Sequence, residues 1–357
     1  MNITEYLDKD LLLKMIDLKY VDVRKHPELD LYILNYSKLC TFDWVWNDVT
    51  EKCRGLIVDS TGEIKARSFK KFYNYEEIED KNIIPNLPYK VYEKMDGSLG
   101  ILYWKGDIPA IATRGSFESM QAIDASIILI QKYEHIIDQI PKHLTFLFEI
   151  IYPDDQKVVN YGDTEDLFLL AVIDTNTGKE LNIDDFDHLF RPVYEYRNVA
   201  EWKKLRDEID GDNREGFVIK FDNNFRMKLK YEEYFDLHKL LYSITPKYIL
   251  ELLMNDKIDD LIVLKDKFGE HHWNKIDTTI REFKRKFDQI RLECKLNFDG
   301  NIYPTRKDAA EQFKSCKYPS VMFAMYDGKD ITSFIWKIIK KQFKNGTEEN
   351  SILEISR

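Results

Sequence analysis

The sequence has 357 residues, of which 44% are hydrophobic and 32% are charged, so it is long enough for two domains with ordinary packed cores. Its formal net charge of −10 argues against a protein that coats nucleic acid non-specifically, because such affinity comes from neutralised phosphates, and any RNA contact must use local basic patches. Apolar runs such as Leu167 to Ile173 are too short to cross a bilayer, and the first residues do not resemble a secretion signal, so we expect no membrane role and a cytoplasmic location.

Short β-like runs separated by turn residues dominate the sequence from Leu31 to Lys230. Ser60-Thr61-Gly62 is a plausible hairpin turn between two of them, and Asp222-Asn223-Asn224 is another. This texture predicts an antiparallel-rich core. The expected strands are Leu31–Tyr36, Gly55–Asp59, Glu63–Arg67, Tyr89–Glu93, Leu99–Trp104, Leu144–Ile151, Leu167–Ile173, Gly216–Phe221 and Phe225–Lys230.

Two helices are expected within this β-rich part. Between Glu118 and Ile137 the isoleucines at 123, 127, 130 and 137 recur at near-helical spacing, which predicts a helix with one apolar stripe. A second, more polar helix is expected from Ala200 to Ile209.

After Lys230 the sequence changes to helical periodicity, with segments near Leu237–Ile244, Ile249–Met254, Ile276–Leu296, Ala309–Phe313 and Thr332–Phe343. We place a boundary between Lys230 and Phe235. The fold class expected is α+β, with an antiparallel-rich domain at residues 1–233 and an all-helical domain at 234–357.

The central motif is K-x-D-G, formed by Lys94, Asp96 and Gly97 between two β-like runs. Alone it is weak, because a surface lysine before an Asp-Gly turn is common in hairpin loops. The motif gains weight from three features later in the chain, which come in this order: Glu149 in a strand, Glu215-Gly-Phe-Val-Ile-Lys220, and Lys228 with Lys230 on one face of a strand. This ordered set is the signature of covalent nucleotidyltransferases, so residues 1–233 are expected to form a nucleotidyltransferase domain.

Three further segments are more specific. Cys53-Arg-Gly-Leu-Ile-Val-Asp59, Phe69-Lys-Lys-Phe-Tyr-Asn74 and Thr113-Arg-Gly-Ser116 resemble the matching segments of the phage RNA ligase 1 family, the single-strand RNA ligases of T-even bacteriophages. The resemblance covers Tyr36 to Lys230, and that family also ends in an all-helical domain. Arg114 departs from it, because lysine is expected there; the charge is kept but the hydrogen-bond geometry is not.

The resemblance implies an ATP-dependent RNA ligase that forms a lysyl-adenylate on Lys94 and joins a 5′-phosphate to a 3′-hydroxyl of RNA. ATP is then a substrate, and Mg²⁺, with Mn²⁺ as an alternative, is the expected metal. The implied partner is RNA with such ends, for example a cleaved tRNA, and cooperation with an end-healing kinase or phosphatase would fit. The abundance of Lys, Ile, Asn, Tyr and Phe indicates an AT-rich genome and suits a virus, which would place the enzyme in the host cytoplasm.

A lysine that attacks the α-phosphorus of ATP must be neutral, and neighbouring cations favour that form. We therefore predict that Lys228, Lys230, Arg54 and a bound Mg²⁺ depress the pKa of Lys94. The expected catalytic residues are Lys94, Lys228, Lys230 and Glu215. Glu215, Asp96 and Glu149 are the candidates for holding the metal, largely through water.

More residues are expected to bind the nucleotide than to take part in catalysis. Lys228 and Lys230 would hold the α-phosphate, Gly97 would let the backbone approach the nucleotide, and Phe72 or Tyr73 would pack on the nucleoside. The resemblance adds residues that orient the β- and γ-phosphates. The full predicted ATP-binding set is Tyr36, Arg54, Lys71, Phe72, Tyr73, Glu93, Lys94, Gly97, Arg114, Glu149, Glu215, Gly216, Lys228 and Lys230.

Several alternatives stay open at this point. Lys228 and Lys230 could guard a strand edge, and His271-His272-Trp273 is better explained as structure or a helix boundary than as a metal site. Lys284, Arg285 and Lys286 form either a solvated helix face or an RNA-binding face. A DNA ligase, a capping enzyme or an inactive RNA-binding scaffold are the competing functions. The four scattered cysteines are expected to be reduced thiols.

Overall fold

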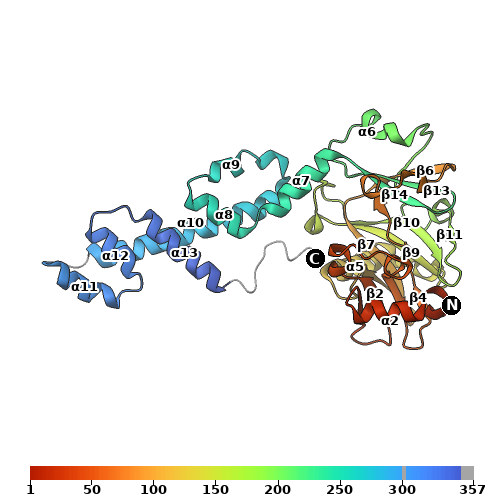
Figure 1. Cartoon of the computed structure of the whole chain (residues 1–357), viewed down its shortest axis with the longest axis horizontal. Coiled ribbons are helices and arrows are strands. Elements are labelled where there is room, and N and C mark those ends of the chain that lie inside the picture. The colour runs from red at the N-terminus through yellow and green to blue at the C-terminus, as the bar shows by residue number, and fades with distance from the viewer. Residues whose placement is uncertain (300–302, 347–357) are drawn as a thin grey trace. The chain divides into compact units, whose positions relative to one another are not determined.

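The computed structural model describes residues 1–299 and 303–346, and the chain divides into two compact units, Met1–Asp236 and Leu237–Arg357 (Figure 1). The first unit is built on β-sheets and the second on helices, which confirms the α+β class. The predicted boundary ended at Phe235, one residue before the observed one. Within the described residues, no helix combines the length and apolar character that a membrane span needs.

The first sheet is a four-stranded antiparallel meander near the N-terminus. One face packs on α2 and α4, where Leu12, Met15, Val49 and Leu56 are buried together. The elements are α1 (Ile3–Tyr6), α2 (Lys9–Asp17), β1 (Val21–Lys25), β2 (Tyr32–Tyr36), α3 (Lys38–Phe42), α4 (Asp48–Lys52), β3 (Arg54–Val58) and β4 (Ile64–Ala66).

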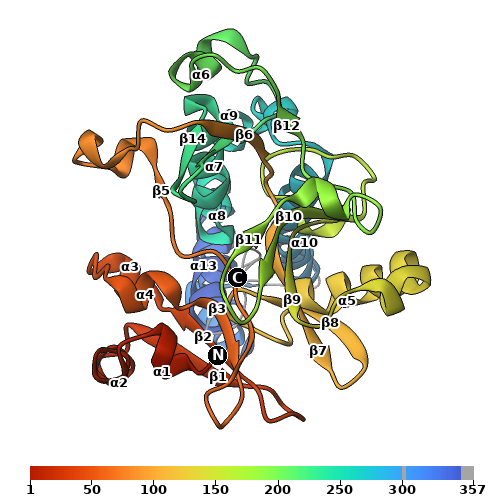
Figure 2. The same ribbon diagram turned by 90° about the vertical axis from the view of Figure 1, so that its right-hand side faces the viewer.

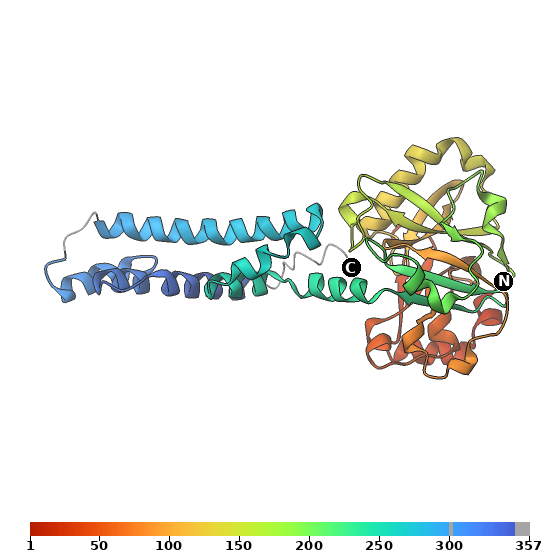
Figure 3. The same ribbon diagram turned by 90° about the horizontal axis from the view of Figure 1, so that it is seen from above.

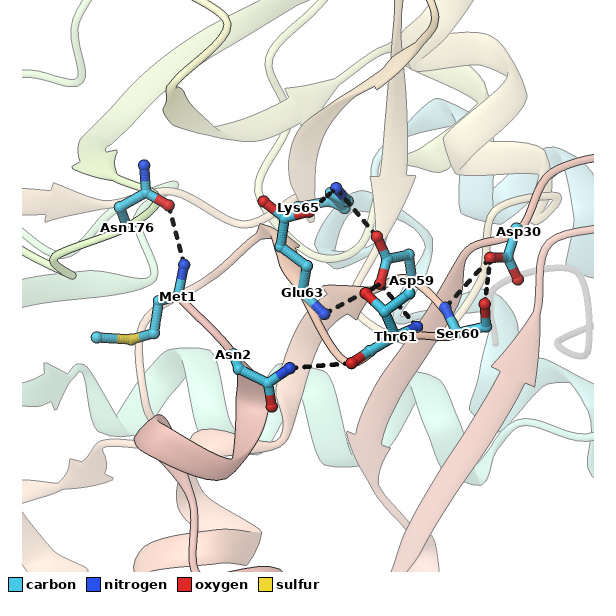
Figure 4. A network of polar contacts seen from close by, with 9 residues as sticks. All are labelled: Met1, Asn2, Asp30, Asp59, Ser60, Thr61, Glu63, Lys65 and Asn176. Atoms are coloured by element: carbon cyan, nitrogen blue, oxygen red, sulfur yellow. Dashed lines mark hydrogen bonds and ion pairs between the residues drawn. The ribbon is translucent and has the colours of Figure 1, made fainter.

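The turn between β3 and β4 is held by side chains (Figure 4). The Asp59 carboxylate accepts from the backbone and hydroxyl of Thr61 and from the Glu63 amide, and it pairs with Lys65 at 3.0 Å. Gly62 has φ +82°, a conformation that glycine adopts readily. The predicted hairpin turn at residues 60–62 is therefore confirmed.

The second sheet has the strand order β11-β10-β9-β7-β8, and one face packs on the first sheet. Its other face is covered by α5 (Met120–Tyr133), which continues as the 3₁₀ segment η3 (Glu134–Gln139); Figure 2 shows this helix beside the strands. The strands are β7 (Ser98–Lys105), β8 (Ile108–Thr113), β9 (Leu144–Ile151), β10 (Asp166–Asp174) and β11 (Glu180–Leu181).

The predicted apolar stripe of the α5 helix is wrong. Ile123, Ile127 and Ile130 are each about two-fifths exposed, whereas Ala122, Ala125, Ile128 and Leu129 are buried against the sheet. The small alanines let the helix lie close to the strands, so the buried face follows them rather than the isoleucines.

The third sheet has the order β12-β6-β13-β14-β5, with β5 parallel to β14. In place of the helix predicted at 200–209 there are only a 3₁₀ turn, η6 (Trp202–Lys204), and one α-helical turn, α6 (Leu205–Glu208). The strands are β5 (Tyr73–Asn74), β6 (Tyr89–Lys94), β12 (Glu195–Tyr196), β13 (Gly216–Phe221) and β14 (Arg226–Lys230); the other 3₁₀ segments are Tyr75–Glu77, Lys81–Ile83, Pro153–Asp155 and Ile183–Phe186.

The second unit is organised around one long helix, α10, which packs against α8, α12 and α13 (Figure 3). His271 and His272 lie in its first turn and Trp273 is buried, so the helix-boundary interpretation is confirmed. The elements are α7 (Glu232–Ser243, which begins in the first unit), α8 (Pro246–Met254), α9 (Ile258–Ile262), the 3₁₀ segment η7 (Lys265–Lys267), α10 (Glu270–Asp299), α11 (Arg306–Ser315), α12 (Pro319–Tyr326) and α13 (Thr332–Gly346).

Candidate active site

The K-x-D-G segment is the crossover between two sheets. Lys94 is the last residue of β6 in the third sheet, and Ser98 is the first residue of β7 in the second. β6 pairs with β12 and β13, whereas β7 pairs with β8 and β9. The two strands are therefore not partners in a hairpin, and the hairpin-loop interpretation of this motif is wrong.

A buried carboxylate joins two of the predicted lysines. The Lys94 Nζ lies 2.9 Å from Glu215 Oε2, and the Lys230 Nζ lies 2.6 Å from Glu215 Oε1. Register produces this arrangement, because Gly216 at the start of β13 pairs with Lys94 on one side and Lys230 on the other. Glu215 is only 3% exposed, so both of its oxygens are held by ammonium groups away from bulk water.

The ion pairs fix the protonation of this group. Burial opposes ionisation of Glu215, but the charges of Lys94 and Lys230 overcome it and lower the pKa of that carboxyl. Burial likewise disfavours the Lys94 ammonium, yet Glu215 and Glu149 raise the pKa of Lys94 above its ordinary value. The predicted depression of the Lys94 pKa is thus wrong for the protein without ligands, since carboxylates rather than cations are its nearest neighbours.

Lys228 has the property that was predicted for Lys94. Burial, together with the charges of Lys94, Lys71 and Arg54, lowers the pKa of Lys228 to about 7. Among the described residues its ammonium forms no ion pair, and it lies 5.3 Å from the centre of the Phe72 ring. A partly desolvated cation without a counter-ion is well suited to meet a phosphate group. The strand-edge interpretation of Lys228 and Lys230 is also wrong, because β14 is paired on both sides.

Glu149 closes the site from the second sheet. Its Oε1 accepts a hydrogen bond of 2.9 Å from the Gly97 amide, which ties β9 to the crossover loop. Burial and, more weakly, the nearby Glu215 outweigh the attraction of Lys94, and they raise the pKa of Glu149 to about 7. Two buried carboxylates that repel each other are typical of a functional site rather than of a packing core.

Asp96 is placed differently from the other acidic candidates. Its carboxylate accepts hydrogen bonds from the backbone amides of Val158 and Val159 at 2.8 and 2.9 Å and from the Tyr234 hydroxyl at 2.7 Å. The Asp96 amide in turn donates to the Tyr161 hydroxyl at 2.8 Å. These contacts favour a role in positioning the loop over the predicted role in holding a metal. Sequence reasoning missed both tyrosines, and no local pattern marks them.

Two glycines of the motifs are required by packing. A Cβ on Gly97 would lie 2.3 Å from the Ile150 carbonyl oxygen, and a Cβ on Gly216, whose φ is +145°, would lie 2.2 Å from the Leu229 oxygen. The prediction that Gly97 serves close approach to a nucleotide therefore gains a competing explanation. Both glycines let the strands approach closely enough to bring Lys94, Glu149 and Glu215 together.

Further cations line the same region from the first sheet, from the segment after it and from the loop after β8. Arg114 donates to the Tyr36 hydroxyl and lies 4.6 Å from that ring, whereas Arg54 donates to the Ser68 hydroxyl at 3.2 Å. Burial is the main cause that lowers the pKa of Arg54, and the positive charge of Arg114 lowers it further. Most of the predicted phosphate-orienting residues are therefore neighbours.

The aromatic candidates separate into two environments. The Phe72 ring lies beside Arg54 at 5.9 Å and beside Lys228, which suits a nucleotide contact. Tyr73 instead donates to Glu51 at 2.7 Å and forms one wall of a cage around Lys71, whose Nζ is 4.3 Å from its ring. Glu93 lies on β6 next to Lys94, where its amide donates to the Tyr194 carbonyl at 2.9 Å.

A divalent cation fits the donor set in part. Glu149 and Glu215 offer the carboxylate oxygens that Mg²⁺ prefers, and a cation would relieve their repulsion. In the described ranges no three His, Cys, Asp or Glu side chains are arranged to hold one ion, so water or phosphate oxygens would complete its coordination.

The predicted RNA-binding residues are not part of this site. Lys284, Arg285 and Lys286 lie in the second unit, exposed on α10, while Phe283 and Ile290 are buried.

Comparison with known proteins places this site in a family. The chain is 28% identical over 273 residues to a putative bifunctional polynucleotide kinase/RNA ligase of Autographa californica nuclear polyhedrosis virus, across 68% of the chain but 39% of that protein. It is 24% identical to an RNA ligase of Rhodothermus phage RM378, across 79% of the chain and 78% of that protein. An archaeal ATP-dependent RNA ligase structure aligns with a TM-score of 0.46 and 14% identity, covering 85% of this chain and 84% of that one.

The decisive match is to a family model described as RNA ligase. It spans residues 52–235, just over half of the chain, and so includes Lys94, Glu149, Glu215, Lys228 and Lys230. The chain therefore belongs to the RNA ligase family of the phage RNA ligase 1 type.

Proposed function

We propose that this protein is an ATP-dependent RNA ligase that joins 5′-phosphate and 3′-hydroxyl ends through a covalent adenylate on Lys94. The single observation that carries the proposal is the buried Lys94–Glu215–Lys230 arrangement, with both lysines on one carboxylate. A structural ion pair would need only one partner. Here the side chains of Lys94, Lys230 and Lys228 converge. Lys228 forms no ion pair within the described part of the chain, and this arrangement suits transfer of a nucleotidyl group.

The first step is attack of the neutral Lys94 Nζ on the α-phosphorus of ATP. The N–P bond forms as the bond from phosphorus to the β-phosphate oxygen breaks, pyrophosphate leaves, and the amine loses a proton. Because Glu215 and Glu149 hold that proton on Lys94 in the free protein, the site must be activated when ATP binds. A divalent cation on these carboxylates would supply positive charge that favours the neutral amine.

Lys228 would respond in the opposite direction. With a pKa lowered to about 7, it is partly neutral in the free protein, and a bound α-phosphate would favour its charged form. We propose that Lys228 and Lys230 then stabilise the charge on the α-phosphate during transfer, while Arg54, Lys71, Arg114 and Tyr36 orient the pyrophosphate.

Two further transfers would complete the reaction. An oxygen of the RNA 5′-phosphate attacks the adenylate phosphorus, the N–P bond breaks, and Lys94 recovers its proton. The RNA 3′-hydroxyl then attacks the 5′-phosphorus, AMP leaves, and the hydroxyl proton is released. Each transfer is an in-line displacement, so the attacking and leaving groups occupy opposite sides of the phosphorus.

The finer assignments belong to this proposal as well. We propose Mg²⁺ as the metal, with Mn²⁺ as an alternative, and Glu215 and Glu149 as the residues that hold it. RNA with cleaved ends, such as a nicked tRNA loop, is the proposed substrate. Lys284, Arg285 and Lys286 on α10 would contribute to its choice, and the host cytoplasm would be the place of action. The kinase half named in the baculovirus relative suggests that an end-healing activity cooperates.

The test is incubation of purified protein with α-labelled ATP and Mg²⁺, beside Lys94→Arg, and then denaturation in detergent at alkaline pH, which leaves an N–P bond intact. Label on the wild type alone supports the adenylate, and subsequent transfer to 5′-phosphorylated RNA but not to nicked DNA supports the RNA ligase. Label from GTP in preference to ATP would indicate a capping enzyme. Absence of label from both proteins would leave an inactive RNA-binding scaffold as the better explanation.

A further inference from the structure

The segment between α3 and α4 carries two aromatic side chains that face solvent. Phe42, the last residue of α3, is 87% exposed, and Trp44 is 52% exposed. Large aromatic side chains are usually drawn into the interior or into a contact, since each buries a large apolar area. Two of them exposed within three residues mark a surface that can bind something flat and apolar.

The conformation of this segment is fixed rather than loose. Trp44 has φ +57°, in the left-handed region that bulky residues rarely adopt. The Val45 amide donates to the Cys40 carbonyl at 3.0 Å, and the Val45 carbonyl accepts from Thr50 at 3.0 Å. Asp43 accepts from Tyr20 at 3.0 Å. Strain held by such contacts on an exposed ring points to a functional reason.

The exposed rings lead into the nucleotide site through aromatic contacts. The Trp44 ring centre lies 6.1 Å from that of Trp46, and the Trp46 centre lies 5.0 Å from that of Tyr36. The Lys71 ammonium lies 4.4 Å from the Trp46 ring and 6.0 Å from the Trp44 ring. Aromatic side chains interleaved with cations are the usual means of binding single-stranded nucleic acid.

The direction of the chemistry says which strand would lie there. Pyrophosphate leaves on the side opposite Lys94, and when Lys94 itself becomes the leaving group, the attacking RNA 5′-phosphate must come from that same side. The 5′-phosphate would then replace the pyrophosphate beside Tyr36, Arg54, Lys71 and Arg114. Its first nucleoside would then lie near Lys71, whose ammonium is 6.0 Å from the Trp44 ring.

We infer that Trp44 and Phe42 form an aromatic platform that stacks the bases next to the 5′-phosphate of the RNA strand to be joined. This inference rests on the proposed function, because it uses the position of the adenylate to orient the RNA. Trp44 would take the terminal base, and Phe42, two residues earlier in the chain and more exposed, would take the next one. Stacking of this kind accepts any base, so the platform selects for an unpaired 5′ end rather than for a sequence.

The experiment removes the same stacking contact in two ways, once from the protein and once from the RNA. The full-length protein, as wild type and as Trp44→Ala, is titrated with a 5′-phosphorylated single-stranded oligoribonucleotide and with the same strand lacking its 5′-terminal base. We expect about tenfold weaker binding for Trp44→Ala and for the abasic strand. Their combination should lose no more than either alone, since both remove one contact.

Three controls separate the platform from other roles. Trp44→Phe should recover most of the binding. Leu13→Ala, which removes a 55% exposed apolar side chain from α2, should bind like the wild type. Adenylylation of Lys94 by ATP should stay within about twofold in Trp44→Ala, because Lys71 still contacts Trp46 and Tyr73.

Unchanged RNA binding by Trp44→Ala would overturn the platform, and so would losses that add in the combined measurement. An adenylylation defect as large as the binding defect would also overturn it, because Trp44 would then serve the Lys71 cage. Binding is measured directly, so the platform is judged even if the wild type takes no label, a result that would count against the proposed function.

Discussion

The two units treat charge in opposite ways. In the described residues, every charged side chain that is buried belongs to the first unit, including Arg67, Asp96, Glu149 and Glu215. In the described part of the second unit the cations of α10 from Arg281 onward face solvent, and only apolar residues and Thr279 are buried. Buried charge lowers stability and is retained where chemistry needs it, whereas exposed charge can serve binding at little cost to the fold.

The largest effect should come from Lys94, the proposed nucleophile. Lys94→Arg keeps a cation beside Glu215 but cannot form the adenylate, so labelling from α-labelled ATP should fall to the level of a blank. Because the ion pair is retained, the melting temperature should change by no more than a few degrees. Full labelling of this variant would show that another residue forms the adenylate. The buried charge of Lys94 would then not be explained by chemistry.

The next largest effect is expected at Lys228, where a substitution should lower activity but raise stability. Lys228→Met should reduce adenylylation by about 10²- to 10³-fold, because the α-phosphate loses its partner. The folded pKa of about 7 lies below the unfolded value of 10.5, so the penalty for the cation is full below pH 7 and disappears as pH rises to 10.5. Denaturant titration should therefore find the variant up to about 5 kcal/mol more stable at pH 6 and no more stable near pH 10.5.

The stability of Glu149→Gln relative to the wild type should depend on pH in the opposite direction. The folded pKa of about 7 lies above the ordinary value of 4.5, so stability is lost as pH rises from 4.5 through 7. The variant should match the wild type near pH 4.5 and exceed its unfolding free energy by up to about 3 kcal/mol at pH 8. Adenylylation should fall by about a hundredfold at saturating Mg²⁺. A variant less stable than the wild type at pH 8 would show that Glu149 serves structure.

The smallest expected effect lies in the second unit. Reversal of Lys284, Arg285 and Lys286 to glutamate should weaken binding of a structured RNA by about tenfold or more and flatten its salt dependence. Adenylylation of Lys94 and the melting temperature should stay unchanged, because these side chains are exposed and their neighbours Phe283 and Ile290 carry the packing. Reversal of Glu282, Asp288 and Glu293 to lysine on the same helix is the matched control, and equal losses from both sets would remove the RNA-binding face.

Much of the β-rich unit could be predicted because strand length and alternation are local. The bounds of β9 and β13 match the predicted ones residue for residue. The ordered motifs also named the residues that meet around Glu215, since strand-borne side chains two residues apart share a face. The helical character of the second unit could be predicted from periodicity in the same way.

The features that could not be predicted depend on contacts between distant segments. The pKa of Lys94 is set by a glutamate 121 positions away, brought opposite it by the β6–β13 register. The role of Asp96 depends on Tyr234, 138 positions away. The buried face of α5 was missed because alanines define it, and a hydrophobic pattern gives them less weight than isoleucine.

The separation of Lys94 from Glu215 along the chain also has a consequence during synthesis. Lys94 leaves the ribosome 121 residues before its counter-ion Glu215, and β6 lacks its neighbour β13 for that interval. A nascent or truncated chain that stops short of Glu215 therefore lacks the carboxylate that joins Lys94 to Lys230, and it should not consume ATP. On the proposed function, nucleotide turnover should become possible only after β14 has emerged and paired with β13, so unfinished molecules should not carry out the reaction.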